Sequence, residues 1–362
     1  MNPGRRLGLL RKRLADSGIP AIVVTDVVNI RYITGFEGVF DDHANVACLV
    51  TESIAQAFTD SRYTEAAVEA AVGTDWSVRA VDQSLYVELC DVLAGSGVGS
   101  LALESSMPYG RFRFISECFD GNVEMIDQWI EEQRQVKEPE ELDRIQQAAK
   151  LTDRAFEHIL TRLGVGVTER EIAWEIEAFM RSEGADGLAF PPIVASGLNS
   201  SRPHAIASEK VLELGDLVTI DLGAKVDGYC ADMTRTVVIG KASEQQRELH
   251  AVVLEAHAAG LQALRGGLRG QDIDAKAREV IESAGFAGRF GHGLGHGVGL
   301  EVHELPTVSP RGRAAVLTGS VVTVEPGIYI PGLGGVRIED LAVVESEGYT
   351  LLSGSPRELL EL

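Results

Sequence analysis

The first part of the chain alternates short apolar runs with amphipathic stretches. Residues 19–36 and 46–60 are rich in valine, isoleucine and alanine and predict buried strands, whereas residues 61–71 and 85–95 have the spacing of helices. Residues 1–18 predict a basic amphipathic helix. No long apolar run follows this helix, so the segment does not have the pattern of a signal peptide. Strands that alternate with helices predict a small α/β domain.

A charged segment, residues 131–150, separates this domain from the rest of the chain. Pro139 is at a position where a helix can begin. Proline has no N–H group, and an N–H group in the first turn of a helix has no hydrogen-bond partner within the helix. The pattern after it predicts a long helix over residues 139–163. We therefore predict two domains, residues 1–132 and residues 133–362.

An internal repeat follows this boundary. Residues 166–187 align with residues 267–288, and the alignment matches Gly166 with Gly267, Ile172 with Ile273, Ser182 with Ser283, Gly184 with Gly285 and Gly187 with Gly288. Each copy comes after a helical stretch and before a glycine-bearing stretch, a histidine and two strands. The shared order predicts two similar helix–helix–hairpin halves that form one α+β domain, with their sheets meeting in the middle.

The composition narrows the possible partners. Hydrophobic residues make up 45% of the chain and the formal net charge is −21, which argues against binding to nucleic acid or to an anionic membrane surface. No apolar stretch has the length of a membrane span. Four cysteines are widely spaced without a CxxC pair, so we expect no disulfide framework and a reduced, cytoplasmic location; they are Cys48, Cys90, Cys118 and Cys230.

Each predicted half ends in a hairpin that carries one acidic residue on each arm. Asp221 and Asp232 flank a turn at "KVDG", and Glu325 and Glu339 flank a turn at "PGLGG". Cross-strand neighbours have Cβ atoms about 5 Å apart, so each pair is expected to lie close together. The surrounding strands are apolar enough to be buried, and buried carboxylates need a positive partner.

Divalent cations are the partner that best fits these four carboxylates. Arg235 and Arg337 are nearby, but two arginines do not balance four acids. Oxygen ligands with one or two imidazoles suit Mn²⁺, Co²⁺, Fe²⁺ or Zn²⁺. Four carboxylates and one histidine suit a pair of such ions with an activated water between them.

A glycine-rich segment between Gly291 and Glu304 supplies three of the eight histidines: His292, His296 and His303. Such a segment can be an ordinary loop. Alternatively, its glycines let backbone and ligand approach closely while the histidines serve a metal or a substrate. The carboxylates favour the second interpretation, in which one histidine completes the metal site. The residues themselves do not choose between His292 and His296.

Three other histidines fall in predicted helices and are expected to be plain surface residues: His158, His250 and His257. His204 differs from them because it stands in the polar, proline-containing stretch "SSRPHA".

The order of these motifs resembles the pita-bread metallopeptidases, which include methionine aminopeptidase, aminopeptidase P, prolidase and creatinase. The motifs are Asp221 and Asp232, then "HGLGHGVGLEVHE", "VEPGIYI" and "VRIED". The N-terminal α/β domain and "SGLNSSRPH" make the chain most similar to the branch of Xaa-Pro dipeptidase (prolidase) and aminopeptidase P. The resemblance implies an α+β fold, with a pita-bread catalytic domain after an N-terminal α/β creatinase-like domain, and a homodimer.

The resemblance also implies a role for each site residue. Two divalent ions, with manganese favoured over cobalt, zinc or iron, are bound by Asp221, Asp232, His296, Glu325 and Glu339, of which Asp232 and Glu339 bridge both ions. The substrate is surrounded by His204, His292, His303 and Arg337. Catalysis involves Glu325, which accepts a proton from the bridging water, His303, which stabilises the oxyanion, and His204.

The implied reaction is hydrolysis of the Xaa-Pro bond of a small peptide by a metal-bridged hydroxide, with dipeptides favoured. Three alternatives stay open: aminopeptidase P activity on longer peptides, hydrolysis of another small amide such as an ectoine derivative, and a non-catalytic binding protein on the same fold. The complete ligand set argues against the last alternative and against a metal-free reaction like that of creatinase.

Overall fold

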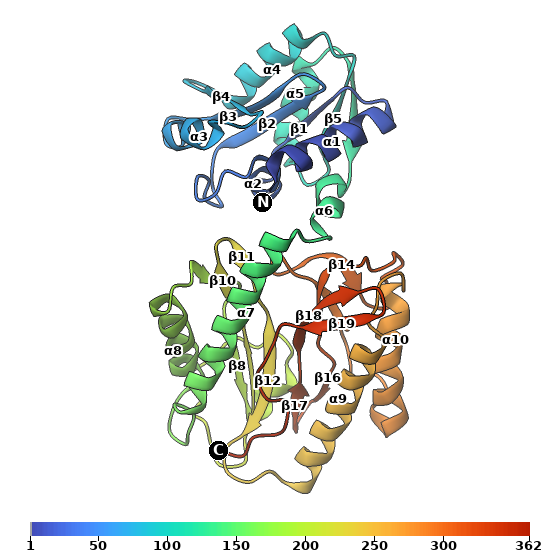
Figure 1. Ribbon diagram of the computed structural model, residues 1–362. Helices are drawn as coiled ribbons and strands as arrows, with labels where there is room; N and C mark the ends of the chain where they lie inside the picture. The colour runs from blue at the N-terminus through green and yellow to red at the C-terminus, as the bar shows by residue number, and fades with distance from the viewer. Residues whose placement is uncertain (1) are drawn as a thin grey trace. The chain divides into compact units, whose positions relative to one another are not determined.

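The computed structural model describes residues 2–362, which form two compact units (Figure 1). The first unit ends at Arg134, and the second is Gln135–Leu362. The boundary predicted from the sequence lies after residue 132. No helix in the described part of the chain is both long and apolar enough to cross a membrane.

The first unit contains a six-stranded sheet in the order β4-β3-β2-β1-β5-β6. Its strands are β1 (Ala21–Val24), β2 (Val46–Thr51), β3 (Ala55–Thr59), β4 (Ser77–Ala80), β5 (Ser100–Glu104) and β6 (Asn122–Ile126). Strands β2 and β3 form an antiparallel hairpin. The pairs β3–β4, β1–β5 and β5–β6 are parallel, and the chain between the strands of each pair includes a helix. The helices are α1 (Pro3–Ser17), α2 (Val27–Thr34), α3 (Thr64–Ala71), α4 (Leu85–Ser96), α5 (Tyr109–Cys118) and α6 (Trp129–Arg134).

One apolar run in this unit is only partly a strand. Residues 19–36 were predicted as a buried strand, but β1 ends at Val24 and helix α2 follows it. The side chain of Asp26 accepts a hydrogen bond from the N–H of Asn29 and caps the helix, and Gly35 ends it in a left-handed conformation. These two caps override the β propensity of the valines and isoleucines between them.

The expectation of reduced cysteines is wrong for one pair. Cys90 of α4 and Cys118 of α5 form a disulfide, with their Cα atoms 6.1 Å apart. The two helices pack against each other, which brings cysteines 28 positions apart in the sequence to bonding distance. The absence of a CxxC pair in the sequence does not exclude a disulfide between cysteines that are distant in the chain. Cys48 and Cys230 are free and buried.

The second unit consists of two halves with the same order of elements. The first half has helices α7 (Pro139–Leu160) and α8 (Glu169–Ser182), then β7 (Gly187–Leu188), β8 (Ile193–Ser196), the 3₁₀ helix η1 (Gly197–Ser201), β9 (Leu217–Leu222), β10 (Ala224–Val226), β11 (Tyr229–Cys230) and β12 (Met233–Val238). Strands β12, β9 and β8 form one sheet, and β11, β10 and β7 form another.

The second half begins with α9 (Glu244–Ala263), α10 (Gly270–Ile281) and the turn η2 (Glu282–Phe286). Its strands are β13 (Gly295–Gly297), β14 (Glu304–Val308), β15 (Val321–Val324), β16 (Gly327–Ile330), β17 (Gly334–Arg337), β18 (Asp340–Glu345) and β19 (Gly348–Leu351). They form a sheet in the order β14-β13-β15-β18-β19 and the pair β16-β17. In Figure 1, α7 and α8 lie on one side of the strands of this unit, and α9 and α10 lie on the other.

Two of the three matched glycine pairs of the repeat share a left-handed backbone conformation. Gly166 and Gly267 have φ angles of 99° and 89°, and Gly184 and Gly285 have the same two values. This left-handed region strongly favours glycine. The few identities of the repeat therefore include positions where the backbone requires that residue.

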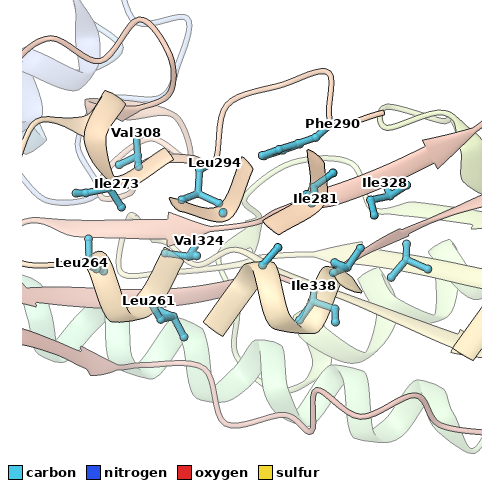
Figure 2. Close-up of a cluster of buried hydrophobic side chains, with 14 of the residues drawn as sticks. Leu261, Leu264, Ile273, Ile281, Phe290, Leu294, Val308, Val324, Ile328 and Ile338 are labelled. Carbon is cyan, nitrogen blue, oxygen red and sulfur yellow. The ribbon is translucent and has the colours of Figure 1, made fainter. Parts of the chain in front are cut away.

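The apolar faces of α9 and α10 pack on the second sheet. Figure 2 shows Leu261 of α9 and Ile273 of α10 in the cluster that also contains Val324 of β15. The two halves are joined where β12 meets β17 and β18: the N–H of Glu339 donates to the carbonyl of Thr234 at 3.1 Å. This seam between the halves carries the acidic residues.

The prediction of a surface position is wrong for two of the helical histidines. His250 and His257 of α9 are 4% and 1% exposed, and burial lowers the pKa of His250 to about 4. They lie on the face of α9 that packs into the core. His158 of α7 is half-buried, with its Nε2 2.7 Å from Glu175 and its ring stacked on Phe179.

Candidate metal centre

The first hairpin places Asp221 and Asp232 on one face of the sheet. Its turn contains Asp227 and Gly228, whose φ angles of 47° and 81° are those of a type I′ hairpin turn. The register of β9 and β12 pairs Asp221 with Thr234. Asp232 directly precedes β12 and lies two residues before Thr234, so the two aspartates are diagonal neighbours.

The second hairpin places Glu325 and Glu339 where one strand pair gives way to another. The β15–β18 ladder ends with Val324 opposite Asp340, and the β16–β17 ladder begins with Gly327 opposite Arg337. Glu325 and Glu339 occupy the gap between these ladders, directly after and before the paired residues.

The glycines of the histidine-rich segment allow close packing of the backbone. A Cβ atom on Gly295 would lie 2.0 Å from the carbonyl oxygen of Thr323, and one on Gly297 would lie 2.1 Å from that of Leu305. Strand β13 therefore fits between β14 and β15 only with glycines on both sides of His296.

His296 points its Nε2 atom at the carboxylates. That atom lies 3.6 Å from Oδ2 of Asp232 and 3.4 Å from Oε1 of Glu325. The other ring nitrogen lies 3.1 Å from the carbonyl oxygen of Gly297, a contact that orients the ring. Burial and the nearby His303 lower the pKa of His296 to about 4, which keeps the imidazole neutral, as metal binding requires.

Asp232, His296 and Glu339 offer ligand atoms that all lie within 4.8 Å of one another. Burial and the charges of Glu339 and Asp221 raise the pKa of Asp232 well above its usual value. Burial and the charge of Asp221 raise the pKa of Glu339 to about 8. Burial and Glu339 likewise raise the pKa of Glu325. The chain has thus gathered more negative charge here than its own cations balance.

Two oxygen atoms identify where the missing positive charge would bind. Oδ1 of Asp221 and Oδ1 of Asp232 are buried without a hydrogen-bond partner. A buried carboxylate oxygen left in this state is strongly unfavourable unless a cation accepts its charge. The oxygen-rich donor set with one imidazole fits divalent metal ions.

Arg337 and Thr234 orient these carboxylates. The guanidinium donates from Nη2 to Oδ2 of Asp221 at 2.6 Å and from Nε to Oγ1 of Thr234 at 3.0 Å. Thr234 in turn donates to Oε2 of Glu339 at 2.6 Å. One arginine and one threonine therefore connect an acid of the first half with an acid of the second.

His292 lies beside the acidic cluster but is not among the residues whose ligand atoms gather there. Its Nε2 is 2.9 Å from the hydroxyl of Tyr329, and its Nδ1 is 2.8 Å from the carbonyl of Gly293 and 3.8 Å from Glu325. Arg337 also donates to Tyr329, at 2.9 Å. Tyr329 and Thr234 are not among the site residues predicted from the sequence; for Tyr329, a polar aromatic residue inside the apolar strand "GIYI" was an available signal.

His204 and His303 are exposed, unlike the acidic residues. The ring of His303 has its centroid 4.2 Å from that of His296. Partial burial and the charge of His204 lower the pKa of His303. Burial lowers the pKa of His292 to about 4, and the charges of Arg337 and His204 act in the same direction. The structure thus gathers all the predicted site residues, with the acids inside and these two histidines open to solvent.

Comparisons with known proteins agree with this geometry. Residues 143–346 match Metallopeptidase family M24, and residues 6–136 match the Creatinase/Prolidase N-terminal domain. The chain is 35% identical to a Xaa-Pro dipeptidase of Pyrococcus furiosus over 98% of this chain and 99% of that protein.

Solved structures of relatives superpose over nearly the whole chain. A Xaa-Pro dipeptidase from Bacillus anthracis gives a TM-score of 0.95 at 39% identity and covers 100% of both chains. An X-Pro aminopeptidase from Thermotoga maritima gives 0.85 at 39% identity, over 95% of this chain and 98% of that chain. These matches confirm the predicted α+β pita-bread domain with a creatinase-like N-terminal domain. The family also implies divalent metal ions, the charge that the carboxylates need. The chain therefore belongs to metallopeptidase family M24, with a creatinase/prolidase N-terminal domain before its catalytic domain.

Proposed function

We propose that this metallopeptidase is a Xaa-Pro dipeptidase that depends on divalent metal ions. The observation that carries the proposal is the cluster of four acids around His296, in which Asp221 and Asp232 keep a buried oxygen without a partner. The full-length similarity to Xaa-Pro dipeptidases supports the choice of substrate.

We assign the metal-binding role to five residues: Asp221, Asp232, His296, Glu325 and Glu339. Asp232 and Glu339 lie deepest and would bridge two ions, for which we propose manganese. Two such ions would lower the pKa of a bound water and polarise the scissile carbonyl. Arg337 keeps Asp221 in place and, through Thr234, also Glu339.

The remaining residues act on the substrate and its protons. Glu325 holds the proton that the attacking water releases and passes it to the proline nitrogen as the peptide bond breaks. His303 donates a hydrogen bond to the oxygen of the tetrahedral intermediate, and His204 holds the peptide beside it. His292 contacts the proline end, with its ring oriented by Tyr329.

The first experiment compares Ala-Pro with Ala-Pro-Ala as substrates of the manganese-loaded enzyme, with a chelator control. Cleavage of the dipeptide that the chelator abolishes supports the dipeptidase. Preferential cleavage of the tripeptide shows an aminopeptidase P instead, a second candidate that the similarity to the Thermotoga maritima enzyme favours. If neither peptide is cut while metal binds, another small amide is the substrate or the protein is not catalytic.

Two substitutions test the assigned roles. We expect Glu325→Gln and His303→Ala to fold normally and to lose most turnover, because each removes a group that handles the proton or the oxyanion. His158→Ala is the control, since His158 contacts helix α8 through Glu175 and Phe179. Full activity in either test variant would exclude that residue from the mechanism.

The homodimer and the cytoplasmic location remain predictions. Sedimentation of the purified protein would give its oligomeric state. Alkylation of the native protein in cell extracts, followed by mass spectrometry, would show whether Cys90 and Cys118 are reduced in the cell or joined as in the structure.

A further inference from the structure

The loop that carries His204 is held at both ends by one buried acid outside the metal centre. The loop starts with η1, Gly197–Ser201, and continues through residues 202–208. Glu169, the first residue of helix α8, is 0% exposed and lies behind this loop.

Glu169 accepts hydrogen bonds from three residues that bracket His204. Before the histidine, Oε1 receives the N–H of Ser196 at 2.7 Å, its hydroxyl at 2.8 Å and the side-chain amide of Asn199 at 3.1 Å. After the histidine, Oε2 receives the N–H of Ser208 at 3.1 Å and its hydroxyl at 2.6 Å. One carboxylate therefore joins both ends of the loop.

The same helix end holds the loop through its backbone. The N–H groups of Glu169 and Arg170 donate to the carbonyls of Lys210 and Ser208, at 3.0 and 3.1 Å. Burial acts to raise the pKa of Glu169, but the hydrogen bonds from Ser208, Ser196 and Asn199 outweigh it and lower the pKa. Glu169 is thus an anion at a helix N-terminus, where the helix dipole also stabilises it.

The middle of the loop contacts the strands of the metal centre. Arg337 donates from Nη1 to the carbonyl of Pro203, next to His204, at 3.2 Å. The N–H of Gly335 donates to the hydroxyl of Ser200 at 2.9 Å. The loop is therefore fixed between Glu169 on one side and the β16–β17 hairpin on the other.

We propose that Glu169 is a positioning residue for the reaction, which holds both ends of the loop so that His204 faces the substrate beside His303. This inference rests on the proposed function, because that function gives His204 its task. Glu169 itself touches neither the carboxylate cluster nor His204, so it acts through the loop alone.

Glu169→Gln tests the proposal, because an amide nitrogen cannot accept the hydrogen bonds that the lost oxygen accepted. We expect amide hydrogen exchange in residues 197–208 to speed up about tenfold in the metal-loaded protein, with bound metal unchanged. For Ala-Pro we expect kcat/KM to fall about tenfold, mostly through KM. A 1 Å misplacement of a catalytic geometry can cost about a hundredfold, so a tenfold loss corresponds to a smaller displacement of His204.

Glu171→Gln is the matched control. Glu171 belongs to the same helix end, is exposed and accepts the N–H of Thr168 at 2.8 Å, so its loss weakens the helix cap without touching the loop. We expect loop exchange and kcat/KM to stay within about twofold of the wild type. Should Glu169→Gln fail to fold, Ser208→Ala removes one hydroxyl bond to Glu169 and gives a smaller effect in the same direction.

A double-mutant cycle separates a positioning role from a general loss of stability. If Glu169 acts through His204, then Glu169→Gln lowers kcat/KM in the wild type but leaves it within about twofold in a His204→Ala background. An equal loss in both backgrounds, or unchanged exchange in the loop of folded Glu169→Gln, overturns the proposal. The exchange measurement needs no substrate, so it stands even if no Xaa-Pro peptide is cleaved.

Discussion

Glu339 and Asp340 are neighbours in the chain and equally buried, yet they have opposite electrostatic environments. Burial acts to raise the pKa of Asp340, but His257, 3.1 Å away, and Arg235, 2.7 Å away, outweigh it and hold the pKa well below its usual value. Arg357 also pairs with Asp340. For Glu339, burial and a neighbouring acid raise the pKa to about 8.

This contrast shows how an acid with its counter-charges inside the chain differs from an acid that is suited to bind a cation. Asp340 has its counter-charges within the chain, so it needs no ligand and serves to join β12, α9 and the C-terminal segment. Glu339 lacks enough positive charge nearby, so it is suited to a cation from outside. Burial alone does not identify a metal site, whereas burial without compensating charge does.

Glu339→Gln has the largest expected effect on activity. Substitution of groups next to a metal ligand lowers metal affinity or activity about 10- to 100-fold, and we expect about a thousandfold loss for Glu339 in its proposed role as a ligand of two ions. The metal-free variant is expected to be at least as stable as the wild type, because glutamine has no carboxyl group whose charged form burial and Asp221 disfavour. Metal analysis, turnover of Ala-Pro and thermal unfolding test this; a less stable metal-free variant would contradict it.

Asp340→Asn is the matched substitution with the opposite result. It leaves the buried Arg235 and His257 without their anion, and we expect the free energy of unfolding to fall by about 3 kcal/mol or more. Denaturant unfolding of the metal-free protein measures this loss. An unchanged unfolding midpoint would show that the internal ion pairs do not stabilise the seam.

Thr234→Val is expected to have an intermediate effect, because valine has a similar shape but no hydroxyl to link Arg337 with Glu339. Metal affinity or kcat/KM is expected to fall about 10- to 100-fold. Thr234→Ser retains the hydroxyl and is the control. Equal losses in both variants would assign the effect to packing instead of hydrogen bonding.

The last prediction concerns the pH dependence of the stability of the metal-free protein. The folded metal-free protein holds a proton on Glu339 up to a pH of about 8, whereas the unfolded chain releases it near 4.5. The folded state binds more protons in this window, so the contribution of Glu339 to stability falls as the pH rises through it. Thermal unfolding with chelator at several pH values should show this slope for the wild type, and a flatter slope for Glu339→Gln or for the metal-loaded enzyme. Identical slopes would contradict the raised pKa.

Local signals predicted much of the fold and the set of acids. The Asp227–Gly228 turn predicted the first hairpin, and apolar arms around Asp221 predicted its burial. The residues left open the choice between His292 and His296, because only the packing of β13 shows which ring nitrogen faces the carboxylates. That packing could not be read from spacing alone.

Interactions between distant segments explain what the sequence did not show. Thr234 links acids of both halves only after β12 and β17 meet. The helix of His250 and His257 does not show by itself that they are buried, because the second sheet that covers α9 lies later in the chain. Their spacing on one helix face was an available signal. Cys90 and Cys118 pair through the packing of two helices in the same way.

The seam between the repeated halves couples cation binding to the integrity of the domain. Asp221 and Asp232 come from the first half, and Glu325 and Glu339 come from the second. A cation held by both sets joins the halves as a removable crosslink, and neither half can open without releasing it. The enzyme with its ions is therefore expected to resist proteolysis as one body, while the chelated enzyme is cut first near the seam.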